Sequence, residues 1–355
     1  ATVKAHTLTA QIIAPSLAIL DEETITFQVI DGTTSTPTAS PVQVGTPSDV
    51  PAYPFSNEGT VSGEFKKWHK ITIGFTGPLT SETADLRPSV DNAFADYRLD
   101  VTFTNGDTTY VVPGYYAADG NAANSVDSTG SVWLVHFSPD LEGEWSWVAS
   151  FTNSFREAIE DTAVGTPISF DGASGSFVVG PTDKTGRDLR GKGRLQYVGK
   201  HHYQFAETKE WFLKAGADSP ENLLAYADFD DTPDEGFLKT WEPHVQDYNE
   251  GDPTWSNGKG KGLIGAINYL SEKGMNAFSF LPLNIGGDDK SVFPYISNST
   301  SDLLRFDVSK LAQWEVIFEH ADKKGMFLHF KTQETEMENL LDGGELGEQR
   351  RMYYR

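Results

Sequence analysis

The chain alternates apolar and polar side chains with a period of two over much of its first half, a pattern typical of β-strands. The stretches "HKITIGFTG", "YRLDVTFTN" and "SVWLVHFSP" show this pattern, and turn-forming residues separate them. Asn105-Gly106 lies between two such stretches, and both residues readily adopt the positive φ angles of a tight hairpin turn. The pattern predicts an antiparallel β-sandwich over residues 57–185, without long helices.

Two further β-like stretches, "AHTLTAQIIA" and "ETITFQVI", precede the sandwich. They are followed by the Thr-, Pro- and Ser-rich stretch "DGTTSTPTASPVQVGTPSDVPAYP", whose composition is typical of a loop or linker. We therefore expect residues 1–56 to contain N-terminal strands and a linker.

From residue 186 onward, apolar runs of strand length alternate with helical periodicity. The runs "WFLKAGAD", "NAFSFLPL" and "MFLHFK" are predicted to be buried strands. One helix is expected before Gly274, and another between an Asp307 N-cap and Gly325. The stretch "EMENLLDGGELGEQRRMYYR" predicts a last helix with a Gly-Gly break. Repeated strand–helix units predict an α/β domain with a parallel sheet that is buried on both faces.

Polar side chains follow each of the three predicted parallel strands, at the point where the strand ends. In parallel α/β folds, the loops at the C-terminal ends of the strands build the functional site. The candidate binding residues at these ends are Asp218, Glu221 and Asn222 after the first strand, Asn284 and Asp288 after the second, and Lys331, Gln333 and Glu334 after the third.

Carboxylates at these positions point to sugar chemistry. Glycoside hydrolysis needs two carboxylates beside the scissile bond, one protonated and one ionised, and Glu334 and Glu336 are candidates for one of them. Glu336 and Glu338 also fit the first turn of a helix, where the helix dipole favours acids. Asn284 and Asp288 are candidates for binding sugar hydroxyls, although an ordinary glycine-rich turn explains the same residues.

Two other segments carry polar clusters. Trp241 and His244 lie in "WEPHVQDYNEGDPTW", where an exposed Trp would stack on a sugar ring and a packed Trp would not. The carboxylates of "DSPENLLAYADFDDTPDEG" are numerous enough for a structural Ca²⁺ ion but lack the spacing of an EF-hand. We expect His201, His202 and His329 to be structural. The sandwich tryptophans expected in the core are Trp133, Trp145 and Trp147.

The chain is strongly acidic, with 51 Asp and Glu against 28 Lys and Arg and a net charge of -23. Such a surface repels phosphate backbones and anionic membranes, so neither nucleic acid nor a membrane is an expected partner. The sequence has no cysteine and none of the common nucleotide, zinc-protease or serine-hydrolase motifs, so we expect no cofactor. The opening "ATVKAHTLTAQ" is compatible with signal removal, which predicts a secreted protein, extracellular or periplasmic.

Several phrases of the sequence resemble a known architecture. "YVVPGYYAADG" and "VWLVHFSPDLEGEWSW" resemble the N-terminal β-sandwich of the DUF5060 type, which precedes (β/α)8 barrels in bacterial glycoside hydrolases. "FLKAGADSPENLLAY", "GKGLIGAINYLSEKGMNAFSFLPLNIGGD" and "LHFKTQETEMENLLDGGELGEQRRMYYR" are similar to the opening of such a TIM barrel. The resemblance covers residues 60–355 and implies that residues 186–355 form the first three βα units of the barrel.

The same resemblance implies a glycosidase whose acid/base and nucleophile lie at the ends of barrel strands four and seven. Because a (β/α)8 barrel takes about 250 residues, we expect the catalytic pair to lie beyond residue 355. Glu334 is then the candidate catalytic carboxylate in this chain. The implied substrate is a polysaccharide or its oligosaccharides, marine or algal material included. Two alternatives stay open, a non-catalytic carbohydrate-binding or adhesion protein that uses the sandwich, and a polysaccharide lyase.

Overall fold

The computed structural model describes residues 3–13, 19–30, 55–83, 91–218, 221–236, 238–288, 290–296 and 303–355. The chain divides into two compact units, residues 1–40 and 41–355. In the first unit, β1 (Val3–Ile13) and β2 (Ile19–Ile30) form an antiparallel hairpin, so the two expected N-terminal strands are present. The expected linker falls largely on residues 31–54, which lie outside the described residues. The expected boundaries at residues 56 and 185 stay predictions.

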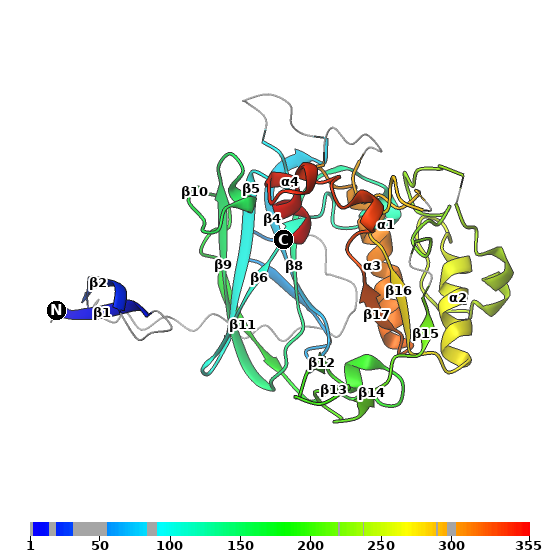
Figure 1. Ribbon diagram of the computed structural model, residues 1–355, viewed down its shortest axis with the longest axis horizontal. Helices are drawn as coiled ribbons and strands as arrows, with labels where there is room; N and C mark the ends of the chain where they lie inside the picture. The colour runs from blue at the N-terminus through cyan, green and yellow to red at the C-terminus, as the bar shows by residue number, and fades with distance from the viewer. Residues whose placement is uncertain are drawn as a thin grey trace. The chain divides into compact units, whose positions relative to one another are not determined.

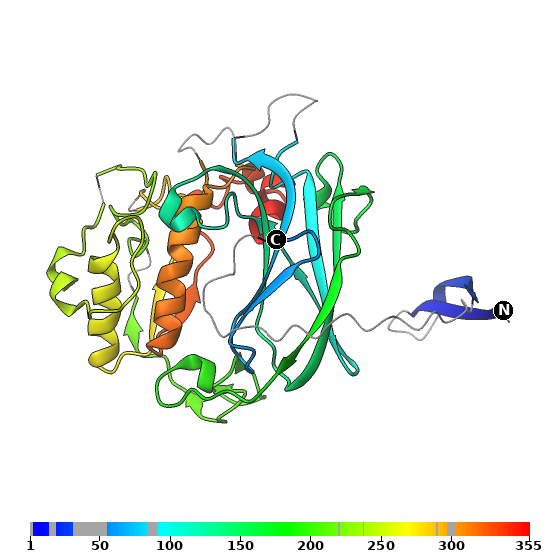
Figure 2. The same ribbon diagram turned by 180° about the vertical axis from the view of Figure 1, so that it is seen from behind.

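Two antiparallel sheets form the predicted β-sandwich within the second unit (Figures 1 and 2). One sheet has the strand order β3-β4-β8-β7, and the other has the order β10-β9-β5-β6, with β11 also paired to β9. The loop of the β5–β6 hairpin is formed by Gly106 and Asp107, because Asn105 pairs with Thr108. Gly106 has the expected positive φ, 56°, whereas Asn105 does not. The bounds are β3 Thr60–Gly63, β4 Ile71–Ser81, β5 Tyr97–Asn105, β6 Thr108–Pro113, β7 Tyr115–Tyr116, β8 Thr129–Phe137, β9 Gly143–Asn153, β10 Thr166–Pro167 and β11 Ser174–Val179, with the short helices α1 Ala122–Ser125 and η1 Glu157–Ile159.

The core of the sandwich lies between the two sheets, because inward-facing residues alternate along the strands. On β9, Trp145 and Trp147 are at most 2% exposed, and the residues next to them are more accessible. Phe103 of β5 stacks on Phe137 of β8, with 4.2 Å between the ring centroids, which joins the two sheets. Trp133 is also buried. The prediction of core tryptophans is therefore confirmed, and these three rings offer no surface platform for a sugar.

The run "WFLKAGAD" does not form one buried strand, contrary to the prediction. Its first part is β14 (Trp211–Phe212), which pairs antiparallel with β13 (Tyr203–Phe205), and β13 pairs with β12 (Leu195–Gln196). Its last part is β15 (Gly216–Ala217), which starts the parallel sheet. Trp211 and Leu213 are 54% and 70% exposed, whereas Phe212 packs against Phe205 and Ala277. An apolar run therefore crosses between two sheets and buries one of its three large side chains.

The strands β15, β16 (Ala277–Phe280) and β17 (Phe327–Phe330) form a parallel sheet in that order. Phe278 and Phe280 pack with residues of α2 (Lys261–Glu272) and α3 (Val308–Lys323) in one apolar cluster. On the other face, β16 is buried, β15 is exposed and β17 is half-buried. Burial on both faces is therefore confirmed for the central strand and wrong for the two outer ones, and closure into a (β/α)8 barrel stays a prediction.

The helix ends follow the sequence signals. Asp307 Oδ1 accepts a hydrogen bond of 2.9 Å from the backbone N–H of Lys310, and the glycines after α2 and α3, Gly274 and Gly325, have φ angles of 83° and 74°. The last predicted segment forms η4 (Thr335–Met337), η5 (Asp342–Gly344) and α4 (Glu348–Tyr354), and the expected break lies at Gly343 and Gly344, which adopt positive φ. A further interruption between η4 and η5 was not predicted. The remaining turns are η2 (Leu189–Gly191) and η3 (Glu242–Asp247). Among the described helices, none combines the length and apolar character needed to cross a membrane.

Glu82 joins the sandwich to the start of α3, and it makes the stability of the fold depend on pH. Its Oε2 accepts a 2.9 Å hydrogen bond from the Val308 backbone N–H. Burial raises the pKa of Glu82 to about 7, and the charges of Asp307 and Asp231 add to the rise, although the Val308 hydrogen bond opposes it. Since the pKa in the fold lies above the ordinary value of 4.5, the folded state binds the proton more tightly, and stability falls as pH rises between these two values.

The substitution Glu82→Gln tests this effect, because glutamine keeps a carbonyl oxygen for Val308 and cannot ionise. We expect it to raise the free energy of unfolding at pH 8 and to leave it nearly unchanged at pH 4, measured by urea denaturation. An equal effect at both pH values would show that ionisation of Glu82 carries no cost.

Candidate functional site

Alternation along the parallel strands sends two polar side chains to the face that α2 and α3 leave uncovered. Phe278 and Phe280 face the helices, so Ser279 between them faces the other way. On β17, His329 has the same orientation, and it is the register partner of Ser279. The lower part of this face is closed by an apolar cluster around Phe212. The polar pair therefore lies above an apolar floor, towards the C-terminal ends of the strands.

Lys214 completes a hydrogen-bonded triad with this pair. Its Nζ donates to Ser279 Oγ at 2.7 Å and to His329 Nδ1 at 2.9 Å. Burial lowers the pKa of His329, and the charges of Lys214 and Lys331 lower it further. The imidazole is therefore neutral near pH 7, with Nδ1 as the acceptor and Nε2 as the donor.

Beyond this triad, towards the C-terminal ends of the strands, lies an ion pair between Asp218 and Lys331. Asp218, after β15, accepts a 2.9 Å hydrogen bond from Lys331 Nζ, after β17, and lies 3.9 Å from Lys214 Nζ. The hydrogen bonds from Lys331 and from Ser279 lower the pKa of Asp218 to about 2. Asp218 is therefore ionised at all physiological pH values, and its side chain is 57% exposed, so it remains accessible to a ligand.

Glu334 lies in the same strand-end region and has the opposite electrostatic character. Its Oε2 accepts a 2.9 Å hydrogen bond from the Asp288 backbone N–H, while its buried Oε1 has no partner among the described residues. Burial raises the pKa of Glu334; the Asp288 hydrogen bond opposes this, and the charges of Asp288, Glu221 and Glu336 add to the rise. Glu334 therefore stays protonated to a higher pH than an ordinary glutamate, and a protonated carboxyl is a hydrogen-bond donor.

A glycine makes this arrangement of Glu334 possible. A Cβ atom on Gly287 would lie 1.7 Å from Glu334 Oε2, so no other residue fits there without moving the carboxyl group. We expect Gly287→Ala to displace Glu334 and to weaken ligand binding at the sheet edge as strongly as removal of the Glu334 side chain, about 10–100-fold. Gly180→Ala is the matched control, because a Cβ atom there meets nothing within 4 Å. Equal binding by both variants, measured by calorimetric titration, would contradict this role.

Asn284 holds the loop rather than a ligand. It is fully buried, its Oδ1 accepts from the Val292 backbone N–H at 2.8 Å, and its Nδ2 donates to the Glu221 carbonyl oxygen. Its amide is therefore used within the protein, and it brings the segment after β15 next to the loop after β16. Glu221 and Asn222 lie on this first segment, partly exposed. Gln333 is partly exposed and donates to the Met337 carbonyl oxygen at 3.4 Å.

Trp241 and His244 do not join these residues. They lie at η3 against α2, where the His244 ring packs on Tyr269 and His244 Nδ1 lies 2.9 Å from Asp247 Oδ2. The close approach depends on Gly265 of α2, where a Cβ atom would lie 1.9 Å from the His244 carbonyl oxygen. Their packing on the helix places them outside the polar cluster at the strand ends, and a role in sugar binding stays a prediction.

Two of the loop carboxylates considered for Ca²⁺, Asp228 and Asp230, are engaged by the protein itself. Asp228 Oδ2 accepts from the Tyr226 hydroxyl at 2.7 Å and from the Gly260 backbone N–H at 2.8 Å. Asp230 Oδ2 accepts from Gln313 Nε2 at 2.6 Å. These two carboxylates hold the loop after β15 against α2 and α3.

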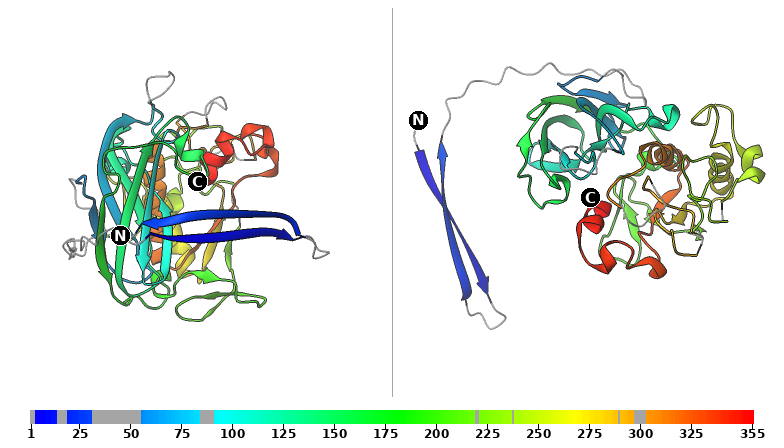
Figure 3. Two further views of the ribbon diagram at one scale, coloured as in Figure 1. Left: turned by 90° about the vertical axis from the view of Figure 1, so that its left-hand side faces the viewer. Right: turned by 90° about the horizontal axis from the view of Figure 1, so that it is seen from above.

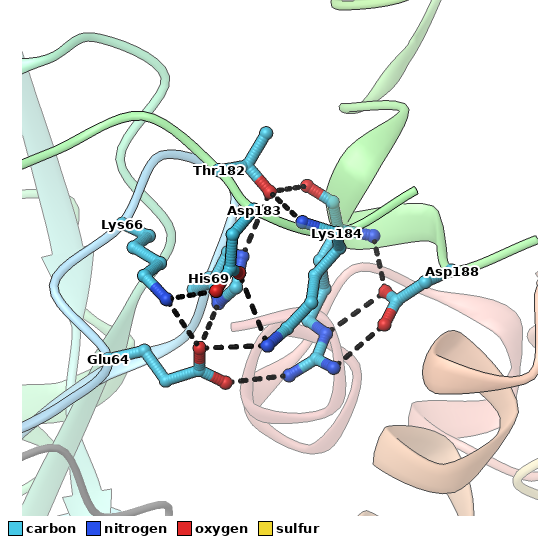
Figure 4. Close-up of polar contacts among 8 residues, drawn as sticks. Glu64, Lys66, His69, Thr182, Asp183, Lys184 and Asp188 are labelled. Carbon is cyan, nitrogen blue, oxygen red and sulfur yellow. Dashed lines mark hydrogen bonds and ion pairs between the residues drawn. The ribbon is translucent and has the colours of Figure 1, made fainter. Parts of the chain in front are cut away.

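Within the described part of the chain, one group of side chains has metal-ligand spacing. Glu64, His69 and Asp183 bring one ligand atom each within 4.8 Å of one another. Figure 4 shows that lysines occupy the same place: Glu64 Oε2 lies 3.0 Å from Lys184 Nζ and 3.4 Å from Lys66 Nζ. Arg190 and Asp188 extend this network, in which three acids balance three bases. A divalent cation would add two uncompensated charges, so the donor set fits an ion-pair network better than a metal site.

Sequence reasoning missed Lys214 and Ser279 and regarded His329 as structural. The sequence feature that could have indicated Ser279 and His329 is a single polar residue inside each short apolar strand, in "AFSF" and "FLHF". Because both strands alternate in the same register, the two polar residues had to share a face.

One comparison with known proteins supports the predicted sandwich. A family model described as a domain of unknown function, DUF5060, matches residues 64–152, so the resemblance is confirmed for the sandwich. Among solved structures, the chain is similar to "a putative glycoside hydrolase from Bacteroides vulgatus", with 16% sequence identity and a TM-score of 0.46. The match covers 75% of this chain, which spans 40% of the length of that chain. No protein with a curated description matches.

Proposed function

We propose that this chain is part of a glycoside hydrolase that acts on a polysaccharide or its oligosaccharides, and that the C-terminal edge of its parallel sheet binds the sugar. One observation carries the proposal. Two carboxyl groups, Asp218 and Glu334, lie at this edge, and their surroundings shift their pKa values in opposite directions. Glycosidase sites require such a separation, since one carboxyl group must donate a proton or hydrogen bond while another stays ionised.

The surrounding groups suit a neutral, hydroxyl-rich ligand. Ionised Asp218 accepts hydrogen bonds from sugar hydroxyls, and Glu334, in its protonated form, donates one to a sugar oxygen. Lys331 and the Nε2–H of neutral His329 supply two further donors beside them. We assign these groups to binding and orientation of the substrate, and we propose that the catalytic pair lies at other barrel strands. A polymeric substrate also fits a protein that works outside the cytoplasm, in the periplasm or the medium.

The test is release of reducing sugar ends from a panel of algal and plant polysaccharides by the protein that contains this chain. We expect release from at least one polymer. Binding without release would instead indicate a non-catalytic carbohydrate-binding protein, and products that absorb in the ultraviolet as unsaturated uronates would indicate a lyase. No binding and no release across the panel would overturn the proposal.

A further inference from the structure

A cavity lies away from the sheet edge, between the sandwich and α3. Its volume is about 700 Å³, within the range of about 300–1,000 Å³ that is usual for small-molecule sites. Figures 2 and 3 show α3, in orange, next to the sandwich. Residues of both line the cavity. Its apolar lining includes Phe94, Tyr97, Trp133, Leu134, Leu311 and Val316.

One end of this cavity is polar and is built by both walls. The Tyr115 hydroxyl lies 2.8 Å from His136 Nε2, and the same nitrogen lies 3.2 Å from Glu315 Oε1 on α3. Lys70 Nζ donates to Glu315 Oε1 at 2.9 Å and also to Glu319 Oε1. The network connects Lys70, which directly precedes β4, and the strands β7 and β8 of the sandwich with one face of α3. It is therefore held in place by elements on both sides of the cavity.

The polar side chains face the cavity rather than bulk solvent. Tyr115 is 40% exposed, yet burial raises the pKa of Tyr115 well above its ordinary value. Tyr115, Glu315 and Glu319 all line the cavity. Burial also raises the pKa of Glu315, but the hydrogen bond and charge of His136 and the charge of Lys70 outweigh it and leave this pKa below the ordinary value. Glu315 is therefore an ionised carboxylate in a sheltered space.

Charge and hydrogen-bonding capacity limit what this end can bind. The two glutamates hold Lys70 through their Oε1 atoms, and among the described residues nothing pairs with their Oε2 atoms. Because Lys70 is shared between two carboxylates, the polar end offers carboxylate oxygens that accept hydrogen bonds. Hydroxyl groups would satisfy these acceptors without adding charge. The aromatic rings next to them suit the apolar face of a sugar ring.

We propose that the cavity between the sandwich and α3 binds a neutral mono- or disaccharide, whose hydroxyl groups donate to Glu315 and Glu319 and whose ring packs on Tyr115. This site is distinct from the sheet edge, and it does not depend on the function proposed there. Through this site the sandwich would take part in sugar binding without using its core tryptophans.

The test is isothermal titration calorimetry of the 355-residue chain with cellobiose and maltose, with benzylamine as a cationic aromatic probe. We expect at least one disaccharide to bind. Tyr115→Ala should weaken that binding at least about tenfold by removing the ring and its hydroxyl group. Ala312→Phe, which fills the cavity from α3 and removes no polar group, should weaken it similarly. Tyr203→Ala, at a 54% exposed tyrosine of β13, is the matched control and should bind as the wild type does.

Lys331→Ala separates this site from the sheet edge. Disaccharide binding that survives Lys331→Ala and is lost in both cavity variants supports the proposal, even if no polysaccharide is cleaved. Binding of benzylamine alone, binding that neither cavity variant changes, or no binding at all would overturn it. Thermal unfolding of each variant shows whether a loss of disaccharide binding comes from misfolding. If Tyr115→Ala does not fold, Ala312→Phe tests the proposal, because it leaves the Tyr115 network in place.

Discussion

Replacing Glu334 by alanine should weaken binding of the oligosaccharide substrate about 10–100-fold, because a hydrogen bond from a partly buried carboxyl group contributes about 1.5–3 kcal/mol. Glu334→Gln should bind about as well as the wild type at acidic pH, since an amide both donates to the sugar and accepts from the Asp288 backbone N–H. The wild type should lose affinity as pH rises through the raised pKa of Glu334, whereas Glu334→Gln should not. Calorimetric titrations at pH 5 and pH 8 measure both effects.

Glu338→Ala is the control for this prediction, since Glu338 lies four residues away and is exposed. The account would be contradicted if Glu334→Ala and Glu338→Ala bind equally well, or if the pH dependence persists in Glu334→Gln. If Glu334→Gln binds normally but no longer cleaves the polymer, Glu334 is the proton donor, and the expectation that the catalytic pair lies elsewhere is wrong.

Glu157→Ala should lower the free energy of unfolding by about 3 kcal/mol, the largest effect that we expect on the sandwich. The Glu157 carboxylate is fully buried and accepts four hydrogen bonds, all of 2.9 Å or less. The donors are the hydroxyl groups of Thr152 and Ser154 and the backbone N–H groups of Val164 and Gly165. Alanine would leave all four without their acceptor, which is costly because buried donors have little access to water.

The same contacts make the contribution of Glu157 depend on pH. Burial raises the pKa of Glu157, but the four hydrogen bonds outweigh it, so the pKa in the fold lies below the ordinary value of 4.5. The stabilisation is therefore complete above pH 4.5 and is lost as pH falls through the lower, folded-state pKa. Glu144→Ala, at an exposed position on β9, should change stability by less than about 0.5 kcal/mol. A loss below about 1 kcal/mol for Glu157→Ala in urea denaturation would show that the four donors find other acceptors.

The sandwich and the two long helices could be predicted because their signals are local. Alternation along β9, the tight turn after Asn105 and the Asp307 cap each depend on residues close in sequence. The division of "WFLKAGAD" between two sheets could not be predicted in this way. It depends on the packing of Phe212 against Phe205 and Ala277, and Ala277 lies far along the chain.

The sequence predicted polar residues at the C-terminal ends of the parallel strands, and the structure brings Asp218 and Lys331 together there, while their role in binding stays a prediction. Polar residues after strands indicated Asp218, Lys331 and Glu334, since strand ends are local features. The sequence did not show that the Asn284 amide makes its hydrogen bonds within the protein, because its partners Glu221 and Val292 become neighbours only in the fold. The opposite pKa shifts of Asp218 and Glu334 also arise from contacts across the loops, with Lys331 and with Asp288.

The most direct test of the central claim is calorimetric titration of the wild-type chain and of Lys331→Ala with linear oligosaccharides of four to six sugars. The account predicts that one of these ligands binds the wild type, that Lys331→Ala weakens binding at least about tenfold by removing a donor and releasing Asp218, and that Tyr115→Ala leaves binding of this longer ligand intact. Binding that Lys331→Ala does not change, or no binding across the panel, would contradict the claim that the C-terminal edge of the parallel sheet binds sugar.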